Sequence, residues 1–463
     1  MSNVNIAFLG ATETVTGSRF LVTSSKSKIL IDCGMFQGIK SDRERNWQPF
    51  PIDPTTIDAV VLSHAHLDHC GYLPVLARDR FVGPIYSTKY TRELSAVILY
   101  DSAKLQTEDA KYAQKKKYSK HDPPKALYGT AEVESTLGLF KEIDFRTRTQ
   151  IAEDVFVTLF PSGHILGSSF ILLEVSGKRF LFTSDLGRNN HPLLSNPDNP
   201  PATGMDVVVT ESTYGDRIHE NSPAEFAKEL NAAFKRGGHV LIPAFAVDRT
   251  EVILMALREL INAKEIPSVP IYVDSPMALA ALNFYRVAIS EGATEIREGV
   301  ADKWLGVDPF DPGNLHQMQT SEESISLNDI SGNSIIISAS GMGTGGRVVH
   351  HLEHMLPNPK NTVILVGFQA AGTRGRSLED GVKQVKMHGN WIPVNAHIVK
   401  VNSFSVHADG DELLEWLRQT DAPSQCFVVH GEPEGQRALK ERLESELHWE
   451  ATIPKSGEVF EVN

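Results

Sequence analysis

Short apolar runs separated by turn-forming residues dominate roughly the first two hundred residues of the chain. Runs of this length, bounded by turn residues, are typical of β-strands. We expect strands at 5–9, 19–23, 28–32, 57–63, 155–160, 170–175, 179–183 and 206–210. A helical pattern over 91–121 ends in a lysine-rich run, which we interpret as a solvated helix face rather than an RNA-contacting patch: Lys115, Lys116, Lys117 and Lys120.

The pattern changes at about residue 211, where short apolar strands begin to alternate with helical segments. We expect strands at 240–242, 271–273, 334–338 and 362–366, with helices such as 250–261 and 346–355 between them. Strands that alternate with helices predict a parallel sheet covered by helices on both faces.

A third segment returns to the character of the first. After a strand at 398–401 we expect a helix at about 410–418, a strand at 427–429 and a helix at about 433–445. The polar residues between these elements match those of the first half. We therefore infer one domain made of 1–210 and 395–463, interrupted by an inserted domain at 211–394.

Composition adds a few exclusions. The chain has 463 residues, 41% of them hydrophobic and 22% charged, as in an ordinary globular protein. It has no apolar run long enough to span a membrane. The formal charge of −13 argues against a protein that coats nucleic acid generally, but not against a nuclease. Three widely spaced cysteines and a start without a signal-peptide pattern predict a reduced, cytoplasmic protein.

The chemistry centres on residues 64–69, which read His-Ala-His-Leu-Asp-His at the end of an expected strand. Imidazole nitrogens and carboxylate oxygens are ligands that zinc prefers. Because side chains two residues apart point to different sides of a helix, a strand-to-turn transition is needed to bring His64 and His66 together. The alternative is a solvated polar turn, or one histidine that caps a helix beginning near Asp68.

Four further candidates lie at expected strand ends or in turns: His164, Asp185, His407 and His430. Each alone would more often be a hydrogen-bonded structural residue than a ligand. Together with residues 64–69 they supply enough nitrogen and oxygen donors for two adjacent zinc ions.

These motifs resemble the metal-binding set of the metallo-β-lactamase fold, with residues 64–69 followed by His164 and Asp185. Asp32 is similar to the early structural aspartate of that fold, which supports the site without binding metal. Glu211, His407 and His430 resemble the three extra motifs of the β-CASP branch, which contains the endonuclease subunit of the pre-mRNA cleavage and polyadenylation machinery. The resemblance implies an α/β fold: an αββα sandwich with an inserted β-CASP domain.

The resemblance also implies two Zn²⁺ per chain. One would be bound by His64, His66 and His164, the other by Asp68, His69 and His430, with Asp185 bridging both. Glu211 and His407 would be catalytic residues outside the metal ligands, paired beside the scissile phosphate, with His407 as general acid. One departure from the branch is Val406, where many relatives have alanine or glycine before the motif histidine.

The implied substrate is single-stranded RNA, because members of the branch that act on RNA carry histidine at the position of His430 and the DNA-repair members carry valine. Endonucleolytic and 5′-exonucleolytic cleavage both stay open. Analogy also suggests a homodimer. The chain ends about thirty residues after His430, so we expect no accessory C-terminal domain. The alternatives are a DNA-repair nuclease, a thioesterase-type hydrolase on the same fold, and a non-catalytic RNA-binding subunit.

Two glycine-rich stretches of the inserted domain are candidate phosphate-binding segments along a cleft wall. The first joins an expected strand to a helix, an arrangement that directs backbone N–H groups toward an anion. The second contains two arginines suited to bidentate phosphate contacts. The residues concerned are Ser340, Gly341, Thr344, Gly345 and Arg347 in the first stretch, and Arg374 and Arg376 in the second. The alternative for each is a tight turn with a solvated arginine.

Overall fold

The chain forms two compact units in the computed structural model, which describes residues 4–116, 125–219 and 223–462. The first unit comprises Met1–Ile218 and Val406–Asn463, and the inserted unit comprises His219–Ser405. Of the lysine-rich run, residues 117 and 120 lie outside the described residues, as do the side chains at 115 and 116. None of the described helices is both long and apolar enough to cross a membrane.

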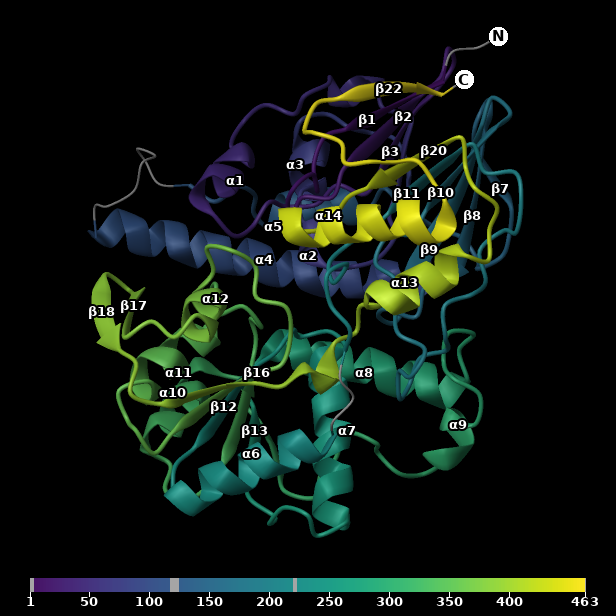
Figure 1. The fold of residues 1–463 in the computed structure, drawn as a ribbon. Coiled ribbons are helices and arrows are strands. Elements are labelled where there is room, and N and C mark those ends of the chain that lie inside the picture. Colours follow the sequence, from purple (N-terminus) through teal and green to yellow (C-terminus); the bar gives the residue numbers. More distant parts are fainter. Residues whose placement is uncertain (1–3, 117–124, 220–222, 463) are drawn as a thin grey trace. The chain divides into compact units, whose positions relative to one another are not determined.

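Two seven-stranded sheets form the first unit (Figure 1). One has the order β22 (Val459–Val462), β1 (Val4–Phe8), β2 (Phe20–Thr23), β3 (Lys28–Ile31), β4 (Ala59–Val61), β5 (Ile85–Ser87), β6 (Phe140–Glu142). The other has the order β21 (Ala451–Thr452), β20 (Gln425–Val428), β11 (Val207–Thr210), β10 (Lys178–Phe182), β9 (Ser169–Val175), β8 (Val155–Pro161), β7 (Thr149–Ala152). The antiparallel pairing of β1 with β22 joins the two ends of the described chain.

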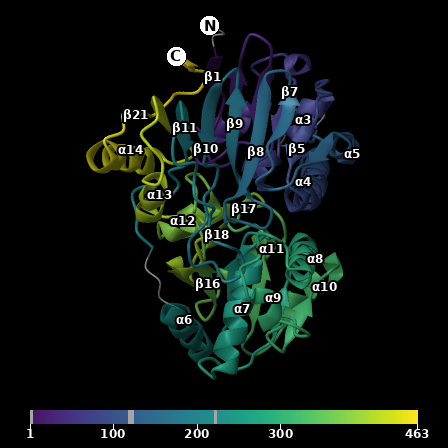
Figure 2. The ribbon, with the colours of Figure 1, turned by 90° about the vertical axis from the view of Figure 1, so that its right-hand side faces the viewer.

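The two sheets share one hydrophobic core. Alternate residues of each sheet, such as Ile6, Phe8, Leu173 and Phe180, point into that core and are fully buried. The outer face of the second sheet packs against α13 (Gly410–Leu417) and α14 (Pro433–Arg442). The remaining helices are α1 (Lys40–Arg45), α2 (Leu67–Cys70), α3 (Leu73–Arg78), α4 (Lys89–Lys116) and α5 (Thr130–Leu137), of which α3, α4 and α5 lie beside β5 (Figure 2). The expected αββα sandwich is confirmed.

The inserted unit contains a six-stranded parallel sheet, which confirms the expected parallel architecture. Its order is β14 (Leu315–Gln317), β13 (Ile271–Val273), β15 (Ile335–Ser338), β12 (Val240–Pro243), β16 (Thr362–Leu365), β19 (His397–Lys400). Its helices are α6 (Pro223–Arg236), α7 (Arg249–Asn262), α8 (Pro276–Glu291), α9 (Val300–Lys303), α10 (Ser321–Ser326), α11 (Arg347–Met355) and α12 (Arg374–Glu379). A separate hairpin is formed by β17 (Gln384–Met387) and β18 (Asn390–Pro393).

The units divide at 218/219 and 405/406, later than the expected boundaries at 210/211 and 394/395. Two physical reasons account for the shift. Glu211 and the turn after it remain attached to the first unit, because the hydroxyl of Ser212 donates to the backbone oxygen of Val429 and its backbone N–H donates to that of His430. Strand β19 belongs to the inserted unit, because it pairs in parallel with β16.

Strand ends position the polar residues of the first unit. Strands β10, β11 and β20 run parallel to one another, and Asp185, Glu211 and His430 each follow the carboxyl end of one of them. In the facing sheet, β3 and β4 are also parallel and lead into Asp32 and His64. Because the carboxyl ends of parallel strands meet at one edge of a sheet, residues far apart in sequence converge there.

Candidate metal centre

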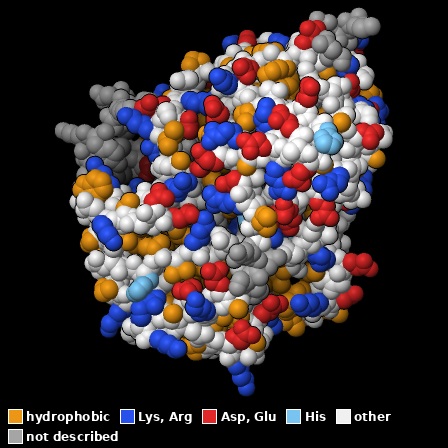
Figure 3. Space-filling view, viewed as in Figure 1, with side chains coloured by type: hydrophobic (Ala, Val, Ile, Leu, Met, Phe, Trp, Pro, Cys, Tyr) orange, Lys and Arg blue, Asp and Glu red, His pale blue; other side chains and the backbone are white. Residues whose placement is uncertain are grey.

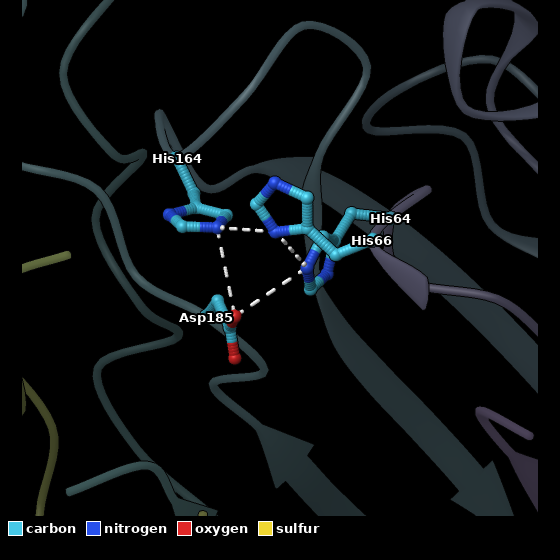
Figure 4. A group of neighbouring side chains, drawn as sticks. All are labelled: His64, His66, His164 and Asp185. Carbon is cyan, nitrogen blue, oxygen red and sulfur yellow. Dashed lines mark hydrogen bonds and ion pairs between the residues drawn. The ribbon is translucent and has the colours of Figure 1, made fainter. Parts of the chain in front are cut away.

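Four side chains of the first unit form a compact group: His64, His66, His164 and Asp185 (Figure 4). Nδ1 of His66 lies 3.2 Å from Nε2 of His64 and 3.1 Å from Nε2 of His164. Oδ2 of Asp185 lies 3.4 Å from Nε2 of His64 and 3.5 Å from Nε2 of His164. Four ligand atoms at about 2.0–2.1 Å from a tetrahedral zinc ion would be about 3.3–3.4 Å apart. The spacing of these four atoms therefore fits zinc.

A second group contains Asp68, His69 and His430. The Nε2 atoms of the two histidines are 3.1 Å apart, and Oδ2 of Asp68 lies 3.6 Å from Nε2 of His430. The second oxygen of Asp185 faces this group, with Oδ1 3.3 Å from Nε2 of His69. That oxygen is buried and accepts no hydrogen bond from the residues that the structure describes. One carboxylate thus presents one oxygen to each group.

Hydrogen bonds on the far side of two rings fix their orientation. Nδ1 of His69 donates to Oδ2 of Asp32 over 2.7 Å, and Nδ1 of His64 lies 3.1 Å from the hydroxyl oxygen of Ser63. The Ser63 hydroxyl itself donates to Asp32, so it accepts from His64. With Nδ1 protonated, Nε2 of each ring keeps its lone pair on the side of the site, as metal-binding histidines require.

Two further rings, those of His164 and His430, are held in the same way. Nδ1 of His164 donates to the backbone oxygen of Val406 over 3.2 Å, and Nδ1 of His430 lies 3.2 Å from the hydroxyl oxygen of Thr213. Because the Val406 contact uses the backbone, the side chain at this departure from the branch does not alter it. Asp32 and Val406 are singled out in the sequence analysis, but Ser63 and Thr213 are not identified there as hydrogen-bond partners of these rings.

Ser63 and Thr213 could have been found from their positions. Ser63 directly precedes His64, and Thr213 lies two residues after Glu211. Both hydroxyls are therefore expected to lie close to the site. A hydroxyl beside a ligand is a weak signal by itself, because serine and threonine are common in turns.

Burial and charge divide the histidines into two sets. Burial lowers the pKa of His64 to about 3 and that of His66 to about 4, and it also lowers the pKa of His164. For His69 and His430 burial acts in the same direction, but the Asp185 carboxylate and neighbouring acids outweigh it and raise the pKa. Neutral imidazoles are the form that binds a metal, and the first set is held in that form.

Glu211 and His407 form a separate pair beside these groups. Nδ1 of His407 donates to Oε2 of Glu211 over 3.1 Å, and the same nitrogen lies 3.9 Å from Oδ2 of Asp185. Both oxygens of Glu211 are occupied, since they also accept from the backbone N–H of Leu186 and the hydroxyl of Thr213. Glu211 is fully buried, whereas the side chain of His407 is 15% exposed. The pair therefore presents an oriented imidazole that solvent can reach.

The two glycine-rich stretches of the inserted unit lie together. The backbone N–H of Gly375 donates to the carbonyl of Met342 over 2.9 Å, and Nη1 of Arg374 donates to the carbonyls of Gly343 and Thr344, each over 3.0 Å. The hydroxyls of Ser340 and Thr344 are 3.0 Å apart. These contacts join the strand-to-helix turn to the start of α12.

Arg347, however, is directed toward protein acceptors. Its Nη1 donates to Oδ1 of Asp274 over 2.6 Å, and the guanidinium also donates to the backbone oxygens of Met318 and Gln319. Asp274 is fully buried and is also bound by His351 over 2.6 Å. This arginine closes an internal ion-pair network, so its contacts favour a structural role, and its expected role in phosphate binding stays a prediction.

Three family models match the chain. Residues 15–243 match the metallo-β-lactamase superfamily, residues 250–378 match the β-CASP domain, and residues 391–454 match the Zn-dependent metallo-hydrolase RNA specificity domain. A ribonuclease of Thermus thermophilus is 34% identical, covering 95% of this chain and 96% of its own length. The chain belongs to the β-CASP branch of the metallo-β-lactamase superfamily.

Other relatives agree with this family. An RNase J-like protein of Methanocaldococcus jannaschii is 31% identical and covers 93% of this chain and 93% of its own length. The transcription termination factor FttA of Pyrococcus horikoshii is 32% identical over 93% of this chain and 67% of its own length. A crystal structure from Enterococcus faecalis shares the fold, with a TM-score of 0.52, 13% identity and coverage of 99% of this chain and 100% of that chain. As a member of this branch, the chain is a metal-dependent nuclease with His/Asp clusters suited to zinc.

Proposed function

We propose that this β-CASP protein hydrolyses phosphodiester bonds of single-stranded RNA at a centre of two zinc ions. The observation that carries the proposal is the pair of ligand groups that share the Asp185 carboxylate, with Oδ2 facing one group and Oδ1 the other. His64, His66 and His164 would bind one zinc, and Asp68, His69 and His430 the other. When bound, two zinc ions supply an activated water and Lewis-acid stabilisation of charge on the phosphoryl oxygens.

The proton on the leaving oxygen is the task of the chain's own residues. His407 is proposed as the general acid, because its Nδ1 is held by Glu211 and its side chain is partly exposed. Glu211 orients the imidazole, so that Nε2 is left to deliver the proton. Asp185 and Asp68 would complete the catalytic set as metal ligands whose negative charges offset part of the charge of the two zinc ions.

RNA is proposed as the substrate for two reasons. The relatives named as a ribonuclease and as an RNase J-like protein cover more than nine-tenths of this chain. His430 also stands where the RNA-cleaving members of the branch have histidine. In the inserted unit, Ser340, Thr344 and the backbone of Gly341 and Gly345 are proposed to contact phosphates. Arg374 and Arg376, at the neighbouring helix start, are proposed to contact phosphates as well, although both also donate to protein acceptors.

Side chains of both charges are interspersed on the face shown in Figure 3, consistent with the formal charge of −13. RNA binding is therefore proposed to depend on these local contacts rather than on a broad basic surface. We place this activity in the cytoplasm, since Cys33, Cys70 and Cys426 are buried thiols outside any disulfide.

End-labelled single-stranded RNA and DNA of the same sequence test this proposal when each is incubated with zinc-loaded protein. We expect cleavage of RNA only, and EDTA should stop it. Metal analysis of the same preparation should give about two zinc per chain. Equal turnover of both polymers would instead favour a DNA-repair nuclease, and absence of cleavage with zinc bound would favour the non-catalytic alternative.

A further inference from the structure

The hairpin β17–β18 of the inserted unit has one face in the core and one face in solvent. Val385 and Met387 belong to the hydrophobic core of this unit. Lys386 and Trp391 pair directly across the hairpin, so their side chains lie on the same outer face. Trp391 is 61% exposed. The outer face of the hairpin therefore presents an exposed indole directly opposite a lysine.

The hairpin is fixed to the rest of the inserted unit at its turn. Nδ1 of His388 donates to Oε2 of Glu353 in α11 over 2.7 Å, and the His388 ring stacks on His350 of the same helix with ring centroids 4.5 Å apart. Because the turn is held at α11 and the inner face is held by the core, the outer face is preorganised. Preorganisation lowers the entropy lost when a ligand binds.

The same hairpin is joined to the glycine-rich turn at 340–346. The guanidinium of Arg374 bridges them, donating from Nε to the backbone oxygen of Lys386 over 3.2 Å and from Nη1 to the carbonyls of Gly343 and Thr344. Figure 1 shows the hairpin next to α12, which begins at Arg374. An exposed aromatic face therefore lies in the same part of the unit as the proposed phosphate contacts.

We propose that Trp391 is a stacking platform for one base of single-stranded RNA, with Lys386 contacting the adjacent phosphate. This inference rests on the proposed function. Proteins that bind single strands combine an aromatic face for the base with cations for the backbone, and such stacking is tolerant of sequence. The outer face of the hairpin offers this combination: besides Trp391 it carries only Gln384, Lys386 and Pro393. A protein partner would be expected to need a larger contiguous apolar patch.

The test is the affinity of the full-length, zinc-loaded protein for a fluorescently labelled single-stranded RNA, measured in a His407→Ala background so that the strand survives. Trp391→Ala should weaken binding about tenfold, whereas Trp391→Phe, which keeps an aromatic face, should bind nearly as well as the parent. Lys386→Ala should reduce the salt dependence of binding by about 0.7 in log–log slope, the value for one phosphate contact on a single strand.

An abasic strand of the same length separates stacking from a structural effect. It should bind to the Trp391→Ala variant and to the parent with equal affinity. Leu305→Ala is the matched control, because it removes an 83% exposed apolar side chain elsewhere in the same unit, and it should not alter affinity. The stacking platform alone would be overturned if Trp391→Ala bound RNA as tightly as the parent. It would also be overturned if Trp391→Ala lost as much affinity for the abasic strand as for the intact strand. No binding by the parent would overturn both the platform and the proposed function.

Discussion

The metal centre of the first unit and the Asp274 network of the inserted unit both bury a carboxylate among histidine and other polar side chains, but they do so in different ways. Around Asp274, an arginine, a histidine and the Ser324 hydroxyl donate to the two carboxylate oxygens over 2.6 Å each. Around Asp185, histidine nitrogens approach at 3.3–3.5 Å, and Oδ1 accepts no hydrogen bond from the described residues.

The difference shows how an internal network can be told from a ligand site. A buried carboxylate whose hydrogen bonds are satisfied by the protein is a structural element. A buried carboxylate whose neighbours converge without satisfying it is arranged for a group that is not part of the chain. Removing a side chain from the first kind should affect stability, and removing one from the second kind should affect metal binding and turnover.

The largest effect on turnover is expected from Asp185→Ala. Because this carboxylate faces both ligand groups, the variant should lose activity below detection and bind less zinc at both positions. Zinc analysis and RNA cleavage measure the two effects. Asp421→Ala, which removes an exposed aspartate of the same unit, is the control. Full activity of Asp185→Ala would contradict the two-zinc arrangement.

Turnover should fall by roughly 10²–10⁴-fold in His407→Ala, the usual contribution of a general acid. The zinc content should stay unchanged, since His407 is assigned no metal. Glu211→Gln should also lower turnover, and the double variant should be little worse than His407→Ala, because residues that act as one unit are non-additive. Zinc loss in His407→Ala would make this residue a ligand, and multiplicative effects would mean that the two residues act independently.

On the structural side of the comparison, Arg347→Ala should reduce the free energy of unfolding by about 3 kcal/mol, because it leaves the buried Asp274 with one cationic partner fewer. Its effect on turnover should be small once the protein is folded. Arg376→Ala is the matched variant: its side chain is 34% exposed, so unfolding should change by at most about 0.5 kcal/mol. Denaturant unfolding and RNA affinity distinguish them, and a large affinity loss in Arg347→Ala at unchanged stability would restore it as a phosphate contact.

The smallest expected effect is the release of protons when zinc binds. Because the pKa of His69 and of His430 is raised in the metal-free protein, zinc must displace protons from these rings. Zinc affinity should therefore increase as pH rises above about 6.5, the ordinary histidine value. Calorimetry at pH 7 in buffers of different ionisation enthalpy should show a net release of protons when zinc binds. Proton uptake on zinc binding would contradict the direction of both shifts.

Much of the fold was predictable from the sequence because apolar runs mark strands whatever the tertiary context. Thus β13 occupies the expected 271–273, and β8 begins at the expected residue 155. The hairpin β17–β18 and the edge strand β22 were not predicted. β17 alternates between polar and apolar residues, but only over four positions, and β18 and β22 do not alternate regularly. Patterns this short identify a strand only when its pairing across the finished sheet or hairpin is known.

The candidate site divides in the same way. Residue types and the family motifs led to the His/Asp groups, which the structure brings together, although the ligand assignments remain predictions. The partners of Arg347 could not be foreseen, because Asp274 and Met318 are separated from it in sequence and meet it only through the β13–β15 pairing and the loop that follows β14. Sequence shows that an arginine lies beside a glycine-rich turn, but not which acceptor it contacts.

The contact between His69 and His430 spans 361 positions of the chain. At synthesis rates of about 5–20 residues per second, a ribosome needs roughly 20–70 s to add the second of these residues after the first. Throughout that interval the second ligand group lacks one of its members. A nascent chain therefore carries an incomplete nuclease while it is still attached to the messenger RNA that encodes it.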